Sequence, residues 1–169
     1  MESFQNEVHN AIDILTKLFE ENNIDFIIVG GTASFIHGYN RTTEDIDIIV
    51  SDLDKDKIKE LVNLYSLESS KKESIKTHFR KVTLDCYCHI NLYLEIIYTG
   101  DTFGDSKVPE LNKFNRKGKH LISLKDLIVM KLEAGRFQDI ADVSKLIEKN
   151  KLPKDFIGND KYLQVWVNT

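Results

Sequence analysis

The pattern of apolar and polar positions divides the first third of the chain into alternating helices and strands. Residues 3–21 carry one apolar stripe at helical spacing, made of Phe4, Val8, Ala11, Ile12, Leu15, Leu18 and Phe19. Residues 24–29 are almost continuously apolar, which is typical of a strand buried on both faces. A Gly-Gly pair, a short helix-like segment and a polar turn follow, and then a second apolar strand, 45–50, that carries two acids.

The pattern downstream predicts more strands and then a run of helices. We expect a helix over 54–67, strands over 82–88 and 92–98, a long loop over 99–119 and a short edge strand over 120–122. Ser123 as N-cap and Gly135 as C-cap delimit a helix, and a second helix over 137–148 would turn Ile140, Val143, Leu146 and Ile147 inward. Pro153 would begin the last helix.

This order predicts an α+β fold, with a mixed β-sheet flanked by helices and followed by a C-terminal helical segment. We expect a core with its N-terminal helix over residues 1–122 and a helical segment over 123–169, packed together as one compact unit.

Composition excludes several classes of function. The chain has 169 residues, of which 41% are hydrophobic and 30% charged, as in an ordinary globular protein. A net charge of −4 argues against general DNA binding. We expect no signal peptide and no membrane span, because the N-terminus is polar and the apolar runs are short. With only two cysteines, Cys86 and Cys88, a reducing cytoplasm is the expected location.

The chemistry concentrates between residues 30 and 47. Asp45 and Asp47 occupy alternate positions of a strand, so both carboxylates share one face and can bind divalent cations. Gly30-Gly31 ends a strand and opens a helix, where free N–H groups favour a phosphate and glycine allows its close approach. Together the two features predict a metal-dependent site for phosphoryl transfer.

The same segment resembles a known family. An apolar-Gly-Gly pattern, followed after thirteen residues by Asp-apolar-Asp, is similar to the signature of the nucleotidyltransferase superfamily, which has the polymerase-β-like fold. Arg41-Thr42-Thr43-Glu44-Asp45-Ile46-Asp47 closely resembles the form found in small bacterial members, including abortive-infection-type toxin nucleotidyltransferases. Weaker similarity continues through 94–105, 128–136 and 139–143.

The resemblance implies a role for each residue. Asp45 and Asp47 would bind Mg²⁺ or Mn²⁺, and Glu95 would be the third carboxylate, in a position where the family more often has Asp. Asp85 is the competing choice. Gly30, Gly31 and Thr32 would hold the triphosphate of an NTP, and attack on the α-phosphate would release pyrophosphate.

Two cationic side chains, Arg41 and Lys131, each have a functional and a structural interpretation. Arg41 either contacts phosphate or pairs with a nearby acid to hold the turn. Lys131 either reaches the triphosphate or only extends along an apolar surface. We interpret Arg136, Asp139 and Asp142, at helical spacing, as a structural salt-bridge network. Cys86, Cys88 and His89 lack the partners of a structural zinc site, and two basic clusters, 71–81 and 113–119, are read as solvated faces.

Three hypotheses follow for the function. The first is a nucleotidyltransferase that modifies a hydroxyl of a protein, an RNA or a small molecule, as a toxin with an antitoxin partner. The second is a catalytically impaired nucleotide-binding or protein-interaction module that retains the fold, a reading motivated by Glu95. The third, an antibiotic-modifying enzyme, needs an acceptor-binding region that the sequence does not identify.

Overall fold

A computed structural model describes residues 2–43, 45–64, 80–84, 92–103 and 106–158. The α-helices are α1 (Glu2–Glu21), α2 (Gly30–Ile36), α3 (Lys55–Leu64), α4 (Leu124–Ala134) and α5 (Phe137–Asn150). The strands are β1 (Phe26–Val29), β2 (Asp45–Val50), β3 (Arg80–Leu84), β4 (Leu92–Tyr98), β5 (Thr102–Phe103), β6 (Ser106–Lys107), β7 (Arg116–Lys117) and β8 (Leu121–Ile122). Two 3₁₀ turns, η1 (Asp52–Asp54) and η2 (Leu111–Lys113), complete the order.

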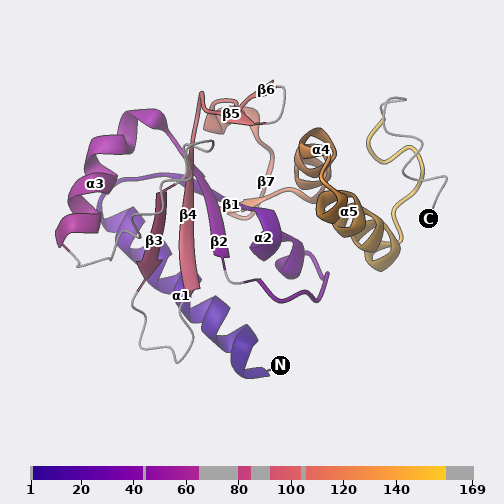
Figure 1. Ribbon diagram of the computed structural model, residues 1–169, viewed down its shortest axis with the longest axis horizontal. Helices are drawn as coiled ribbons and strands as arrows, with labels where there is room; N and C mark the ends of the chain where they lie inside the picture. Colours follow the sequence, from indigo (N-terminus) through magenta and orange to yellow (C-terminus); the bar gives the residue numbers. More distant parts are fainter. Residues whose placement is uncertain (1, 44, 65–79, 85–91, 104–105, 159–169) are drawn as a thin grey trace.

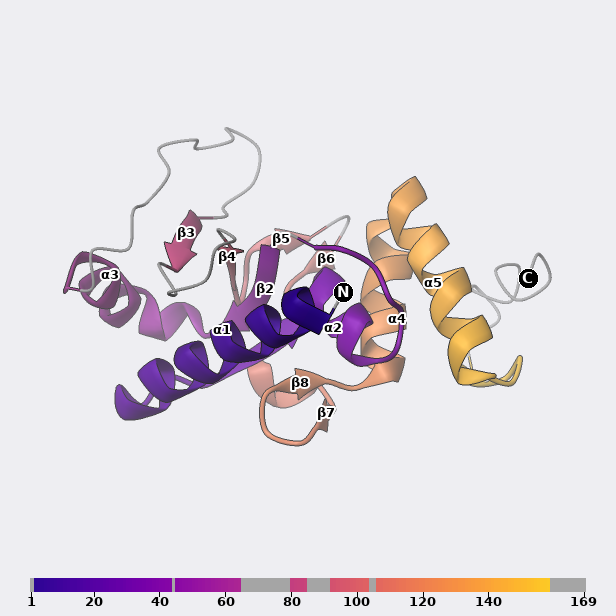
Figure 2. The same ribbon diagram turned by 90° about the horizontal axis from the view of Figure 1, so that it is seen from below.

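The main sheet is mixed and has the strand order β3-β4-β2-β1-β8-β7. β2 pairs antiparallel with β1 and parallel with β4, so the two strands expected to carry the site are neighbours. α1 crosses one face of this sheet, while α4 and α5 pack against each other at the end far from α3 (Figures 1 and 2). The expected α+β fold with a mixed sheet is confirmed.

The core lies between α1 and the sheet. Val8, Ala11 and Leu15 of the α1 stripe are completely buried, as are Ile48 and Ile49 of β2. Burial of each such side chain contributes roughly 1.5–3 kcal/mol, so this interface holds the central strands in a fixed register. The other face of β2 carries Asp45 and Asp47 beside the buried Ile49, and the same face of β4 carries Glu95 beside the buried Ile97.

The caps of α4 follow the expectation from the sequence. The Ser123 hydroxyl accepts a hydrogen bond from the backbone N–H of Asp126, and Gly135 ends the helix in the left-handed conformation with φ 65°. The Asp126 carboxylate accepts from the backbone N–H of Asn115 at 2.6 Å, so the cap also anchors the segment that leads into β7.

Two expectations about the segment before α4 are wrong. Residues 99–119 are not one loop, because they contain the β5–β6 pair, η2 and β7. The strand at 121–122 is not at the edge of the sheet, since β7 pairs on its outer side while β1 pairs on its inner side. Runs of two residues give too little periodicity to be recognised in the sequence.

The C-terminal helices also differ in part. Ile140 was expected to point inward, but it is 37% exposed. The buried residues of α5 are instead Asp139, Asp142, Val143, Leu146 and Ile147. Two acids are therefore buried at positions that the hydrophobic pattern assigned to the exposed face. Residues 153–158 form turns and not the start of a helix, and the rest of the expected last helix lies outside the described residues.

Candidate active site

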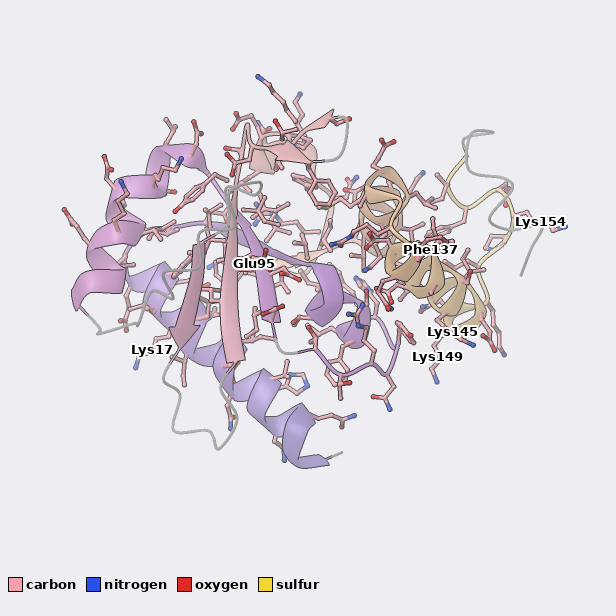
Figure 3. All side chains as sticks on the ribbon, viewed as in Figure 1. Lys17, Glu95, Phe137, Lys145, Lys149 and Lys154 are labelled. Carbon is pink, nitrogen blue, oxygen red and sulfur yellow. The ribbon has the colours of Figure 1, made fainter. Side chains whose placement is uncertain are left out.

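The three predicted carboxylates lie on one face of two adjacent strands. In the parallel pairing of β2 with β4, Asp47 is the direct partner of Glu95, and Asp45 stands two residues before Asp47 on the same face. Ile46 and Ile48, the alternate residues of β2, are 1% and 0% exposed in the core. Core packing therefore fixes which face of β2 carries the acids. Figure 3 places Glu95 on the β4 face turned toward the viewer.

Crowding of like charges changes the acidity of Asp47. Burial together with the negative charges of Glu95 and Asp45 raises the pKa of Asp47 to about 7, and a hydrogen bond with the Glu95 side chain adds to this. A hydrogen bond from the backbone N–H of Gly31 acts in the opposite direction. Asp47 consequently retains a proton at pH values where a carboxyl group is ordinarily ionised.

Both glycines of the pair lie where a side chain would come too close to a neighbouring residue. Gly30 has φ 65°, and a Cβ atom there would lie 2.0 Å from Oδ2 of Asp47. A Cβ atom on Gly31 would lie 3.0 Å from the Thr43 hydroxyl oxygen. The sequence predicted that both glycines bind a phosphate. The structure adds a second reason for glycine at position 30, because a larger residue there would overlap Asp47 on β2.

Thr32 is buried beside the backbone of Asp45. Its side chain is completely buried, and its hydroxyl donates to the carbonyl oxygen of Asp45 at 2.9 Å. The hydroxyl of Thr43 donates to the same carbonyl at 3.0 Å. Two hydroxyl groups thus fix the backbone of the first acid, and Thr32 is absent from the residues that line the cavity described below.

A basic wall faces the acids from the helices. Nζ of Lys131 on α4 donates to Oδ2 of Asp142 on α5 at 2.6 Å, and Arg41 donates to the same oxygen. The other oxygen of Asp142 accepts from Nε2 of Gln138 at 2.8 Å. Asp142 is completely buried and Lys131 is only 5% exposed, so this acid joins α4, α5 and the turn before β2.

Arg136 extends the basic wall at the start of α5. Its guanidinium donates to both oxygens of Asp139, with Nε 2.6 Å from Oδ2 and Nη2 3.2 Å from Oδ1. Asp47 and Glu95 contribute electrostatically to the raised pKa of Arg136, after the dominant hydrogen bond with Asp139. The expected network of Arg136, Asp139 and Asp142 exists, and it also reaches the cavity.

A cavity of about 600 Å³ lies between the acids and the basic wall. Asp45, Asp47, Glu95, Gly30, Gly31, Arg41 and Lys131, all expected from the sequence, line it. Its other lining residues include Ile97, Thr102, Phe103, Leu127, Met130, Arg136, Gln138 and Asp139. Sequence reasoning did not assign Phe103 or Met130 to the site, and only the helical spacing of Met130 with Leu127 gave a signal for one of them.

The donor chemistry fits a divalent cation. Carboxylates are ligands that Mg²⁺ and Mn²⁺ prefer, and the raised pKa of Asp47 reflects negative charge that such a cation would neutralise. In the described part of the chain, however, no group of three or more His, Cys, Asp or Glu side chains is already gathered closely enough to hold a metal ion. Asp85, Cys86, Cys88 and His89 lie outside the described residues.

The basic residues near β7 serve a different part of the fold. Arg116 pairs with Asp25 at 2.7 Å, and Lys119 pairs with Glu20 at 2.6 Å. Both pairs tie the β7–β8 hairpin to the end of α1 and the start of β1, and neither cation lines the cavity. The other basic cluster, 71–81, falls almost wholly outside the described residues.

Comparisons with known proteins concern the fold of the chain. A family described as "Nucleotidyltransferase of unknown function (DUF6036)" matches residues 7–87. An antigenic nucleotidyltransferase-like protein from Paracoccidioides brasiliensis aligns with a TM-score of 0.62 at 18% identity, over 96% of this chain and 87% of that one. The chain has the nucleotidyltransferase fold. No curated protein matches the sequence.

Two further solved structures share the nucleotidyltransferase fold. The antibiotic-resistance factor ANT(2'')-Ia aligns with a TM-score of 0.59 at 12% identity, over 98% of this chain and 92% of that one. The lincosamide antibiotic adenylyltransferase LnuA aligns with a TM-score of 0.54 at 18% identity, over 82% and 94%. Identities this low establish the fold alone. Along the described residues, none of the helices combines the length and apolar character needed to cross a membrane.

Gly30→Ala is expected to destabilise the protein by roughly 2–5 kcal/mol, because a positive φ and overlap with Asp47 act together. Gly100→Ala is the matched control, since Gly100 has φ 82° but nothing within 4 Å of an added Cβ atom. Urea denaturation measures both. If the overlap with Asp47 is real, Asp47→Ala should reduce the cost of Gly30→Ala; equal costs in both backgrounds would contradict it.

Asp142→Asn is expected to cost about 3–5 kcal/mol, because it removes the nearest carboxylate of the buried Lys131 ammonium and the partner of Arg41. Glu148→Gln breaks the exposed Lys145–Glu148 pair on the same helix and should leave the urea midpoint unchanged. Similar midpoints for the two variants would show that Asp142 does not hold the helices to the site.

Metal-free protein is expected to lose stability as the pH rises from about 4 to about 7. In this window folded Asp47 binds a proton that the unfolded chain has released, so the free energy of unfolding falls, by at most about 1.4 kcal/mol per pH unit. Asp47→Asn should remove this slope, and Mg²⁺ should stabilise the wild type at pH 8. Asp13→Asn, on the exposed side of α1, should keep the Mg²⁺ response. An unchanged slope in Asp47→Asn would contradict the assignment.

Proposed function

We propose that this protein transfers a nucleoside monophosphate from an NTP to an acceptor hydroxyl, with Mg²⁺ or Mn²⁺ as cofactor. The observation that carries the proposal is one cavity in which Asp45, Asp47 and Glu95 lie opposite the cations of α4 and α5. Acids suited to a metal and cations suited to phosphates thereby meet in one space on a nucleotidyltransferase fold.

Each wall of the cavity would act on a different part of the reaction. Asp45, Asp47 and Glu95 would hold the divalent cation, which supplies charge neutralisation at the phosphates and lowers the pKa of the attacking hydroxyl. Arg41 and Lys131 would bind the triphosphate while Asp142 keeps their side chains in place. Gly30 and Gly31 would let the phosphates approach the backbone.

The chemical step would be an in-line displacement. The acceptor oxygen forms a bond to the α-phosphorus, and the bond from that phosphorus to the oxygen bridging to the β-phosphate breaks. Pyrophosphate leaves with the electron pair. The acceptor proton would pass to one of the carboxylates of the site.

The similar proteins say more about the chemical class of the acceptor than the cavity does. LnuA was solved with lincomycin bound, and ANT(2'')-Ia was solved in complex with adenylyl-2''-tobramycin. A small-molecule hydroxyl is therefore included beside a protein or an RNA. A toxin role, with an antitoxin protein as partner, rests only on the similarity of residues 41–47 to abortive-infection-type nucleotidyltransferases.

One observation favours a second candidate, a nucleotide-binding module without turnover. The described residues hold no preassembled group of three metal ligands, and Glu95 is one methylene longer than the aspartate usual in the family. This candidate and the enzyme differ in a measurable way, because both bind an NTP with Mg²⁺ but only the enzyme releases pyrophosphate.

Incubation with each α-³²P-labelled NTP, Mg²⁺ or Mn²⁺ and cell lysate should label an acceptor and release pyrophosphate. Asp45→Ala and Asp47→Ala should each reduce labelling at least 100-fold, because each removes a ligand of the cation. Asp54→Ala, on η1 away from the cavity, is the control and should label normally. Labelling that survives both changes would refute the site, and NTP binding without pyrophosphate release would favour the module.

A further inference from the structure

The cavity lining contains an apolar part beside its charged residues. The acids and cations come from β2, β4, α4, the start of α5 and the turn before β2. The apolar part consists of Ile97, Phe103, Leu127, Met130 and Ala134, with the hydroxyl residue Thr102 beside them. These residues come from β4, the β5–β6 hairpin and one side of α4.

The apolar part begins one step along β4 from the acids. Glu95 and Ile97 lie on the same face of that strand, so their Cα atoms are roughly 6.5–7 Å apart. This is about the distance by which a ribose separates the α-phosphate of a nucleotide from its base. A nucleotide whose phosphates lie near the acids and cations can therefore reach the apolar part with its base.

Phe103 provides an aromatic surface at this place. The hairpin that carries it is fixed by pairing of Phe103 with Ser106 and of Thr102 with Lys107. It lies between the end of β4 and α4 in both ribbon views (Figures 1 and 2). Phe103 packs against the hydrophobic core but stays partly exposed and lines the cavity. Its position is thus set before any ligand binds.

The opposite side of this part is equally apolar. Leu127 is 1% exposed, and Met130 follows it by three residues on the same side of α4. Methionine adapts its shape to flat rings and makes favourable contacts with them. Among the described residues that line the cavity, the remaining acid, Asp139, is already paired with Arg136 and lies 3.8 Å from Nζ of Lys131. A polycationic group would find no unused carboxylate there outside the metal-binding acids.

We propose that the apolar part of the cavity, with Phe103 and Met130 as its main contacts, binds the base of the NTP by stacking. The inference rests on the proposed function and adds the location of the base and the residues that hold it. Because every nucleobase has a flat face, stacking of this kind gives affinity with little preference among bases.

Calorimetry on the full chain with Mg²⁺ tests this with two probes, ATP and inorganic tripolyphosphate. Phe103→Ala should weaken ATP binding about tenfold and leave tripolyphosphate binding unchanged, because only ATP carries a ring. Phe103→Tyr should restore ATP binding. Met130→Ala is a second variant with the same expected pattern, and it keeps the test informative if Phe103→Ala lowers the thermal midpoint.

Phe137→Ala is the matched control. Phe137 is 99% exposed on α5, outside the cavity lining, and Figure 3 shows it on that helix away from β4. Its removal should change neither affinity. Different outcomes would overturn the proposed function and the base site. Wild-type protein that binds neither probe would overturn the proposed function together with the base site. Tripolyphosphate bound as tightly as ATP, or equal losses for both probes in Phe103→Ala and Met130→Ala, would overturn the base site alone.

Discussion

The site depends on a repulsion that the fold enforces. The parallel register of β2 against β4 sets Asp47 beside Glu95, and the buried Ile46 and Ile48 prevent β2 from turning its acids away. Burial of Asp47, together with the negative charges of Glu95 and Asp45, raises the pKa of Asp47 to about 7. A protein tolerates such crowding where the packing around it is stronger than the repulsion, and the crowding prepares these acids to bind positive charge.

The basic wall likewise brings like charges together, but its charges are positive. Lys131 and Arg41 both donate to Asp142, a buried acid on α5, so two cations are held at the cavity without meeting the acids of the sheet. With Arg136, the wall has three cations that share two carboxylates, Asp142 and Asp139, so one positive charge is left without a carboxylate of its own in the wall. α5 therefore contributes to the site through a buried residue, Asp142, and not through its exposed polar residues.

Some parts of this arrangement could be predicted because they are local. The strand periodicity of 45–50 placed Asp45 and Asp47 on one face, and Ser123 and Gly135 marked the ends of α4. Other parts could not. The inward stripe of α5 contains Asp142, while Ile140, predicted to be inward, is exposed, because Asp142 is paired with Arg41 from a distant segment and with Lys131 of α4. Phe103 was missed because a two-residue strand has no detectable period.

The sequence by itself determined the strand with two acids and the Gly-Gly entry to the short helix, which are consequences of side-chain spacing and backbone freedom within a few residues. The fold family was predicted from the resemblance of this segment to a known signature. Only the tertiary structure decided that Glu95 is the direct neighbour of Asp47, that Asp142 joins Arg41 to Lys131, and that Phe103 closes the same cavity. Strand register brings Asp47 and Glu95 together across 48 positions of the chain, and helix packing brings Arg41 and Asp142 together across 101, and no local pattern encodes such a pairing.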